Sequence, residues 1–169
     1  MKTLVAIAFC LCSAVARGHS SSDAYLTLDF AARGNDTVIE ARWDIALRDL
    51  HFVLGLDDDG DGALTWGEVR RHRADIASYA YGRLGATSDG APCTIERGKE
   101  LVSTRADGGY AALFFRVVCK GSPHNVALDY RLLFDVDPTH RGIVVLRDGN
   151  ATATSLLSPA NPRIGPLRR

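Results

Sequence analysis

The chain is organised around twelve residues that read Asp57-Asp58-Asp59-Gly60-Asp61-Gly62-Ala63-Leu64-Thr65-Trp66-Gly67-Glu68. A hard cation such as Ca²⁺ takes about six to eight oxygen ligands, and an EF-hand loop supplies them from its positions 1, 3, 5, 7, 9 and 12. Position 6 needs a positive φ, which glycine adopts without steric cost, and Gly62 stands there. The segment therefore predicts one Ca²⁺ site with oxygen ligands from Asp57, Asp59, Asp61, Ala63, Thr65 and Glu68.

The composition of this loop distinguishes a metal site from an acidic surface turn, which Asp and Gly also favour. Five of the twelve residues are acidic and none is basic. Carboxylates held a few ångström apart repel by about 1 kcal/mol per pair even in water, and a bound cation removes that repulsion. Glu68 at position 12 can chelate with both carboxylate oxygens, which suits the large shell of Ca²⁺ better than the octahedral shell of Mg²⁺.

Helical patterns flank the loop on both sides. Before it, apolar residues recur at helical spacing over residues 50–56, and Asp49 is placed to cap that short helix. After it, apolar residues fall on one face over residues 69–84, which predicts a longer helix. We therefore expect one EF-hand-like helix-loop-helix insertion at residues 49–84.

The rest of the chain has the alternating pattern of β-strands. Residues 23–31 and 38–47 alternate apolar and polar side chains around a turn, which predicts a hairpin. Turns rich in Gly, Pro and Asp separate further strand-like segments at residues 93–96, 101–105, 110–119, 126–134, 142–147 and 151–157. This order predicts an α+β fold with an antiparallel β-sheet or sandwich body, a single domain over residues 23–157 and an exposed tail over residues 158–169.

The N-terminus has the features of an export signal. Lys2 precedes the apolar run Leu4–Val15, and Ala14-Val15-Ala16 forms a cleavage site of the small-x-small type. We expect residues 1–16 to be removed, with cleavage after Gly18 as the alternative. The apolar run is shorter than the ~20 residues of a membrane-spanning helix, and no other segment approaches that length. The mature chain is therefore expected to be periplasmic or secreted and to lack a transmembrane span.

Two cysteines, Cys93 and Cys119, remain once the signal peptide has been removed with Cys10 and Cys12. An even number of cysteines in an oxidising compartment predicts a disulfide, which stabilises a fold by about 3 kcal/mol through loop closure. The alternative is a pair of buried thiols. Both cysteines lie in apolar strand-like segments without the C-x-x-C spacing of redox sites, so the predicted bond is structural.

Several function classes are excluded by what the sequence lacks. Its twenty basic and twenty acidic residues balance, so no basic face for nucleic acid is expected. There is no G-x-S-x-G motif, no glycine-rich phosphate loop and no H-x-x-x-H pair. Asp135, Asp137 and His140 gather in one segment and could exchange protons, but Asp, Pro and Gly also favour turns for backbone reasons. We interpret this segment as a braced turn and expect no enzymatic activity.

A family resemblance is carried by five short segments, Asp23–Leu28, Arg42–Leu50, Thr65–Glu68, Tyr130–Asp135 and Asp137–Gly142. In this order they resemble the exported N-terminal region of bacterial HupE/UreJ-like membrane proteins, which are hydrogenase/urease accessory-type proteins with an EF-hand signature in that region. The likeness extends from about Asp23 to Pro162. Such proteins continue into several transmembrane helices, associated by analogy with nickel or cobalt handling, and that part is absent from this sequence.

Two functions are therefore expected. The first is calcium ion binding through a single EF-hand loop in an exported structural or interaction domain, with an unknown protein or membrane partner. The second, implied by the resemblance, is an extracytoplasmic accessory domain of a nickel or cobalt transport-related membrane protein, although an oxygen-only loop suits Ni²⁺ poorly. EF-hands usually occur in pairs, so the edge around Leu64 needs a contact with the β-body or with a second copy of the chain in a homodimer.

Overall fold

The computed structural model describes residues 22–33, 36–121 and 125–167, which form two β-sheets and three short helices. The predicted signal peptide, its cleavage site, Cys10 and Cys12 lie outside the described residues. In chain order the elements are β1 (Asp23–Arg33), β2 (Asp36–Ala46), α1 (Leu47–Leu54), α2 (Trp66–Arg71), α3 (Arg73–Tyr81), β3 (Leu84–Ser88), β4 (Ala91–Pro92), β5 (Thr94–Arg105), β6 (Gly108–Cys119), β7 (Val126–Tyr130), β8 (Arg141–Asp148), β9 (Ala151–Leu157) and β10 (Arg163–Leu167). The prediction of a β-rich α+β fold is confirmed.

A six-stranded sheet with the order β5-β6-β2-β1-β8-β9 forms the body, and a four-stranded sheet has the order β10-β7-β3-β4. The predicted β1–β2 hairpin is confirmed, with Leu26 opposite Trp43 and Leu28 opposite Ala41. β1 also pairs with β8 in parallel, so the prediction of an antiparallel sheet is wrong at this pair. The pairing is parallel because the chain passes through the helices and the second sheet before β8 returns to the edge of β1.

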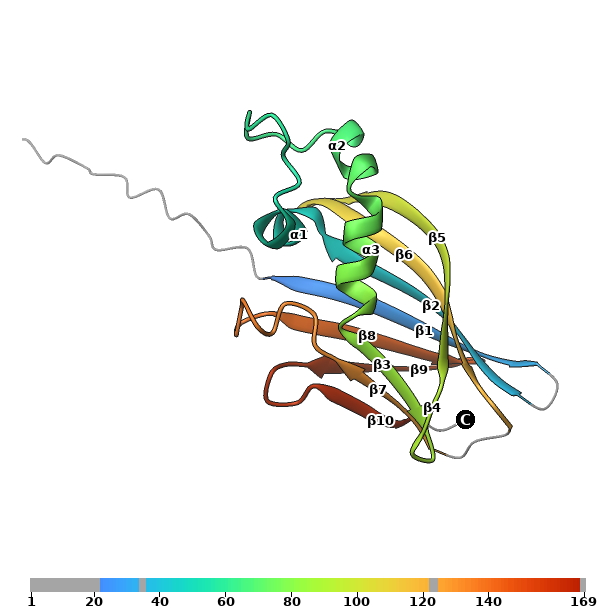
Figure 1. Ribbon diagram of the computed structural model, residues 1–169. Helices are drawn as coiled ribbons and strands as arrows, with labels where there is room; N and C mark the ends of the chain where they lie inside the picture. Colours follow the sequence, from blue (N-terminus) through green and yellow to red (C-terminus); the bar gives the residue numbers. More distant parts are fainter. Residues whose placement is uncertain (1–21, 34–35, 122–124, 168–169) are drawn as a thin grey trace, which may run out of the picture.

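The core lies between the six-stranded sheet on one side and α3 with the four-stranded sheet on the other (Figure 1). Alternate strand residues point into it because successive side chains of a strand face opposite sides. Trp43 of β2 packs against Tyr130 of β7 with ring centroids 5.5 Å apart. Tyr81 of α3 meets Phe115 of β6 edge-on at 5.6 Å. These buried aromatic contacts hold the two layers together.

The helices differ from the sequence-based prediction in their bounds. The N-cap of α1 is Ala46, which makes no side-chain hydrogen bond, so the prediction of Asp49 as the cap is wrong. Asp49 lies instead in the first turn, because β2 runs into α1 without a linking loop. The predicted longer helix is divided at His72 into α2 and α3, and it ends at Tyr81 rather than at Leu84. Among the described residues, no helix has both the length and the apolar character needed to cross a membrane.

Four regions depart from the predicted strand pattern. The predicted strands over residues 93–96 and 101–105 are one continuous strand, β5. Residues 84–88, which the sequence pattern assigns to the end of a helix and the turn after it, form β3. The predicted strand over residues 126–134 ends at Tyr130, and its remainder forms turns. The tail over residues 158–169, predicted to be exposed, contains β10, which pairs with β7 and leaves Leu167 only 4% exposed. The prediction of an exposed tail is wrong at Leu167, because β10 completes the edge of the second sheet, whereas Arg163, Gly165 and Pro166 of the same strand are exposed.

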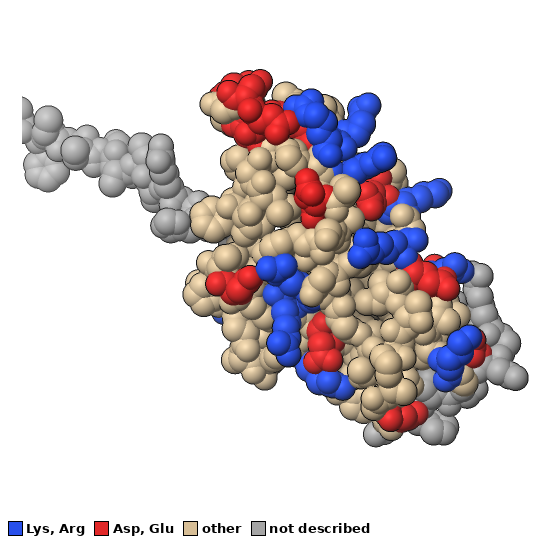
Figure 2. All heavy atoms as spheres, viewed as in Figure 1, with Lys and Arg blue, Asp and Glu red and all other residues tan. Residues whose placement is uncertain are grey.

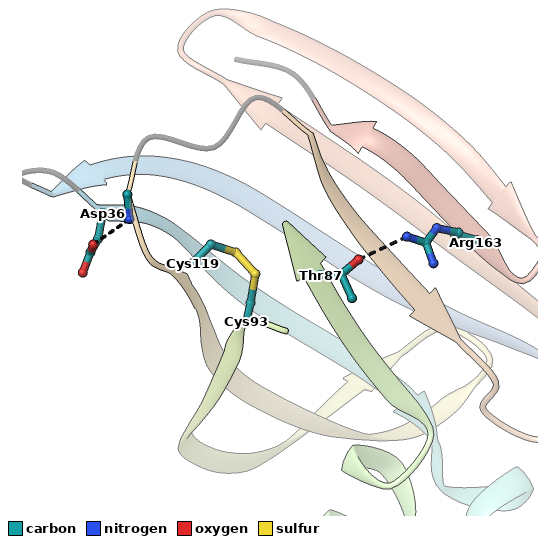
Figure 3. Close-up of a disulfide and its surroundings, with 6 residues drawn as sticks. Asp36, Thr87, Cys93, Cys119 and Arg163 are labelled. Atoms are coloured by element: carbon teal, nitrogen blue, oxygen red, sulfur yellow. Dashed lines mark hydrogen bonds between the residues drawn. A yellow bond between two sulfur atoms is a disulfide. The ribbon is translucent and has the colours of Figure 1, made fainter. Parts of the chain in front are cut away.

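The predicted disulfide between Cys93 and Cys119 is confirmed, with an S–S distance of 2.07 Å (Figure 3). Cys93 lies where the chain passes from β4 in the second sheet to β5 in the first, and Cys119 ends β6. The bond therefore fixes the crossing between the two sheets. Nearby, Arg163 of β10 donates a hydrogen bond to the hydroxyl of Thr87 in β3 at 3.1 Å (Figure 3).

Candidate metal site

The acidic loop joins α1 to α2 beyond one end of the six-stranded sheet (Figure 1). Its entrance is fixed by His51, the residue that closes the last turn of α1. The backbone carbonyl of His51 accepts the N–H of Gly55 at 2.8 Å, and the side-chain Nδ1 of His51 accepts the N–H of Leu56 at 3.1 Å. Gly55 has a φ of 63°, the left-handed cap that glycine favours. Leu56 is fully buried, so the loop starts from a fixed point in the core.

The carboxylates of Asp57, Asp59 and Asp61 converge on one side of the loop. One oxygen from each lies within 4.8 Å of the others. Asp57 is half-buried, whereas Asp59 and Asp61 are exposed. Figure 2 shows acidic side chains gathered at this end of the molecule, with basic side chains beside them. Several carboxylate oxygens within reach of one centre are the arrangement that a hard divalent cation requires.

Backbone N–H groups of the loop hold these carboxylates in place. One oxygen of Asp57 accepts the N–H of Gly60 at 2.7 Å, and the other accepts the N–H of Gly62 at 2.9 Å. Asp61 accepts the N–H of Ala63 at 2.7 Å. The hydrogen bond from Gly62 is the main cause of the lowered pKa of Asp57. Gly62 has a φ of 84°, which agrees with the positive φ expected at position 6.

Glu68 and Thr65 interact with each other at the start of α2. The Thr65 hydroxyl and N–H donate to one Glu68 carboxylate oxygen at 2.7 Å and 2.8 Å, and the hydroxyl oxygen accepts the N–H of Glu68 at 3.3 Å. This reciprocal pair is a capping box. The second carboxylate oxygen accepts the N–H of Asp58 at 2.9 Å. The Thr65 hydroxyl, followed by these N–H donors, lowers the pKa of Glu68 to about 2, so its carboxylate is ionised at neutral pH.

The six predicted ligands therefore fall into two groups. The structure brings together the carboxylates of Asp57, Asp59 and Asp61. Thr65 and Glu68 form the capping box, and Ala63 donates its N–H to Asp61. A Thr followed three residues later by Glu is the sequence signature of a capping box, and it coincides here with positions 9 and 12 of the loop pattern. Glu68 consequently has two competing roles, as a cap and as a predicted ligand.

Asp58, which the loop pattern leaves without a role, ties the loop to the helices that follow. Its carboxylate accepts Nε of Arg71 at 2.7 Å and contacts Nε2 of His72 at 2.8 Å. His72 also contacts the carboxylate of Asp75 at 3.2 Å. The hydrogen bond between Asp58 and His72 is the main cause of both the lowered pKa of Asp58 and the raised pKa of His72. A histidine on an otherwise apolar helix face was the sequence signal for this contact.

Leu64, at position 8 of the loop, lies against the body of the same chain. It is half-buried and packs on the hydrophobic core. It lines a cavity of about 230 Å³ together with Leu47 of α1, Asp107 of the turn between β5 and β6, and Gly108 and Gly109 at the start of β6. The loop is thus attached to the β-body at Leu64 as well as at its buried entrance.

The second polar group of the sequence, Asp135, Asp137 and His140, does not form a common centre. Asp135 pairs with Arg83 at 2.8 Å, and Asp137 accepts the hydroxyl and the N–H of Thr139 at 2.6 Å and 2.8 Å. His140 is fully buried, and it and Asp137 influence each other's pKa through their charges. Asp135 is therefore held by Arg83, whereas Asp137 and His140 share Ser22 as a neighbour, and these contacts brace the turn.

The outer face of the six-stranded sheet has a hollow of about 760 Å³ that is lined mainly by charged residues. At its floor, Asp44 is 3% exposed and pairs with Arg42 at 2.8 Å and Arg105 at 2.9 Å. The two guanidinium groups lie over aromatic rings, Arg42 over Phe114 and Arg105 over Tyr25. At the floor of the hollow, the carboxylate of Asp44 is therefore shared by two guanidinium groups.

Comparisons with known proteins give no evidence on the function of the loop. A scan against protein-family models and a search of curated proteins found no match to this chain. The resemblance to HupE/UreJ-like proteins therefore stays a prediction from the short segments that carry it. What the chain itself presents is a β-rich domain with an acidic loop in which three aspartate side chains converge.

Proposed function

We propose that residues 57–68 bind one Ca²⁺ ion in an exported structural or interaction domain. The observation that supports this most directly is the convergence of one oxygen each from Asp57, Asp59 and Asp61 within 4.8 Å. The loop pattern around them adds a glycine with positive φ at position 6 and an ionised glutamate at position 12. A bound cation relieves the repulsion between these carboxylates, which is the driving force for binding.

Glu68 completes the ligand set by exchanging its hydrogen bonds for the ion. Its carboxylate accepts three hydrogen bonds from Thr65 and Asp58. Ligation through Glu68 requires at least one of these to be given up, and the positive charge of the ion compensates for the loss. The calcium-loaded loop is therefore expected to reposition the first turn of α2, where Trp66 is 58% exposed and serves as a reporter.

The ion is proposed to stiffen the junction between the loop and the β-body. The loop is attached at Leu56 and Leu64, and the carboxylates between these two points carry the unneutralised charge. Extracytoplasmic calcium modules bind with dissociation constants of about 10⁻⁴ to 10⁻³ M, which favours a structural role over a signalling role. The disulfide between Cys93 and Cys119 supports an oxidising, extracytoplasmic location.

Nickel or cobalt handling is the weaker alternative. Ni²⁺ favours imidazole ligands, whereas the group of converging ligands among the described residues consists of three carboxylates. The histidine nearest in sequence after the loop, His72, is already engaged with Asp58 and Asp75. Competition between Ni²⁺ and Ca²⁺ in one titration decides between the two ions, because displacement of Ca²⁺ by Ni²⁺ would favour the alternative.

Calorimetric titration with Ca²⁺ and with Mg²⁺, together with thermal unfolding, tests the proposal. At a Ca²⁺ concentration 100 times the dissociation constant, binding stabilises the fold by about 2.7 kcal/mol, which corresponds to a rise in Tm of about 5 to 10 °C. Asp59→Asn and Glu68→Gln are expected to lose most of this rise. Asp58→Asn is the matched control, because it removes the same charge from the same loop without removing a predicted ligand. A wild-type Tm that is the same in Ca²⁺ and in excess chelator would refute the proposal.

A further inference from the structure

An apolar groove runs between the helices that follow the loop and the edge of the six-stranded sheet. It has a volume of about 270 Å³ and is lined by residues of α2, α3, β5 and β6. Val69, Ile76 and Leu113 form its floor, and each is at most 5% exposed. Trp66 and Leu101 border the groove and are 58% and 52% exposed. The groove therefore connects the buried core with two large apolar side chains that face water.

The described residues include five exposed large hydrophobics, and two of them, Trp66 and Leu101, line this one groove. They come from sequence positions 35 residues apart, on α2 and on the edge strand β5. Exposed apolar side chains that converge on a concavity mark interaction sites more often than scattered ones do.

The rim of the groove is basic. Arg70 and Arg73 line it and are exposed, and neither forms an ion pair with another residue in the described part of the chain. Arg71, which lies between them in sequence, is by contrast bound to Asp58. Glu100 supplies the acidic charge of the lining. In Figure 2 basic side chains are grouped beside the acidic end of the molecule. These two unpaired guanidinium groups therefore favour a bound partner that carries carboxylates.

The size of the groove indicates the kind of occupant. A volume of about 270 Å³ falls below the range of about 300 to 1,000 Å³ that is usual for small-molecule sites. A dry cavity of about 150 Å³ already holds benzene, so one large apolar side chain fits with space for its neighbours. An inserted side chain contacts the buried floor of the groove, whereas a flat lipid surface contacts only the residues at the rim of the groove.

We propose that this groove binds an acidic segment of a partner protein, which inserts one aromatic or leucine side chain against Trp66 and Leu101. Flanking Asp or Glu residues of the segment pair with Arg70 and Arg73. The groove adjoins the calcium loop, because Trp66 lies between Thr65 and Glu68 at the start of α2. Only the calcium dependence of this binding rests on the proposed function. Bound Ca²⁺ repositions the first turn of α2, which carries Trp66, and so changes the affinity of the groove.

Selection from a random-peptide display library on the immobilised protein tests this inference. Enriched peptides are expected to share an aromatic or leucine residue close to Asp or Glu. Their affinity is expected to fall by at least about tenfold on Leu101→Asp, and likewise on combined Arg70→Glu and Arg73→Glu, as for anchors and their charged surroundings. Leu101 is exposed, so the fold tolerates the change, and circular dichroism verifies this.

Matched controls lie outside the groove. Leu156→Asp changes a side chain of similar exposure, 59%, on the opposite edge strand β9. Arg131→Glu reverses an exposed charge that does not line the groove. Both variants are expected to bind the selected peptides as the wild type does. Equal binding by Leu101→Asp, enrichment of basic peptides, or no enrichment at all would overturn the inference.

Two further measurements distinguish binding at the groove from binding at the calcium site and from binding to a lipid surface. Peptide affinity is measured with Ca²⁺, with chelator and on Glu68→Gln, in which peptides are expected to bind without responding to Ca²⁺. Peptide binding without any Ca²⁺ binding would refute the proposed function and leave the groove standing, and the reverse result would refute the groove alone. Sedimentation with phosphatidylglycerol-containing vesicles that is lost on Leu101→Asp would assign the surface to a membrane instead and overturn the inference.

Discussion

The buried imidazole of His140 predicts a measurable loss of stability on mild acidification. His140 is fully buried, and its ring nitrogens contact the hydroxyls of Ser22 at 2.7 Å and Tyr130 at 2.8 Å. Ser22 in turn donates to the carboxylate of Asp49 in α1 at 2.9 Å. Because the Ser22 proton goes to Asp49, Ser22 accepts from Nδ1–H of the imidazole, and Nε2 accepts the proton of Tyr130. This chain of donors is satisfied by a neutral imidazole, with its proton on Nδ1.

The magnitude follows from the pKa of His140. Burial is the main cause that lowers this pKa from 6.5 to about 4. In the unfolded chain the imidazole takes up its proton near pH 6.5, whereas the folded state resists protonation until about pH 4. The contribution of the neutral imidazole to the free energy of unfolding is therefore fully present above pH 6.5 and is lost as the pH falls to about 4. A difference of about 2.5 units at 1.36 kcal/mol per unit amounts to about 3 kcal/mol.

Urea unfolding between pH 7 and pH 4 measures this loss. The wild type is expected to lose about 3 kcal/mol more than His140→Gln over this range, because the variant has no imidazole to protonate. Subtracting one loss of stability from the other removes the contribution of the carboxylates, because both proteins contain them. These carboxylates include Asp49, whose pKa is raised by burial. Equal pH slopes for the two proteins would refute the reasoning. An NMR titration of the wild-type imidazole gives the same answer directly if the variant does not fold, and a pKa near 6.5 would be the refuting result.

Two further predictions concern the disulfide and the helix cap. Replacing Cys93 and Cys119 together by Ala is expected to lower the free energy of unfolding by about 3 kcal/mol, because the bond closes a loop with a sequence separation of 26. Urea unfolding measures this loss, and an unchanged midpoint would contradict the prediction. Thr65→Ala is expected to cost about 1 kcal/mol in chelator through loss of the capping box, and Thr65→Ser is expected to restore most of it. The same Thr65→Ala change removes the hydroxyl that most strongly lowers the pKa of Glu68, so this pKa is expected to rise, and an unchanged value in an NMR titration would show that the remaining N–H donors dominate.

The chain of hydrogen bonds from Tyr130 to Asp49 also bears on the loop. It joins β7, the turn before β8, the start of β1 and the first turn of α1. α1 is the helix that enters the acidic loop, and its last turn is closed by His51. The loop is therefore mounted on a helix whose opposite end is fixed in the core.

Local features were determined by the sequence alone. The convergence of Asp57, Asp59 and Asp61 follows from alternate positions in a short turn whose backbone N–H groups point inward. The β1–β2 hairpin follows from alternation on both sides of a turn, and the disulfide follows from the only two cysteines of the predicted mature chain. In each case the interacting residues are near in sequence or have no competing partner.

The tertiary structure alone decided which distant segments meet. Alternation in β8 is compatible with either neighbour and either direction, and only the folded chain shows β8 between β1 and β9 and parallel to β1. His72, at which the helix is divided, contacts Asp58 14 positions away, and the contact of His140 with Ser22 spans 118 positions. The groove between Trp66 and Leu101 likewise exists only once α2 and α3 lie against β5. The physical reason is that side-chain periodicity specifies which face of an element is buried, whereas the element that covers this face is selected by the packing of the whole chain.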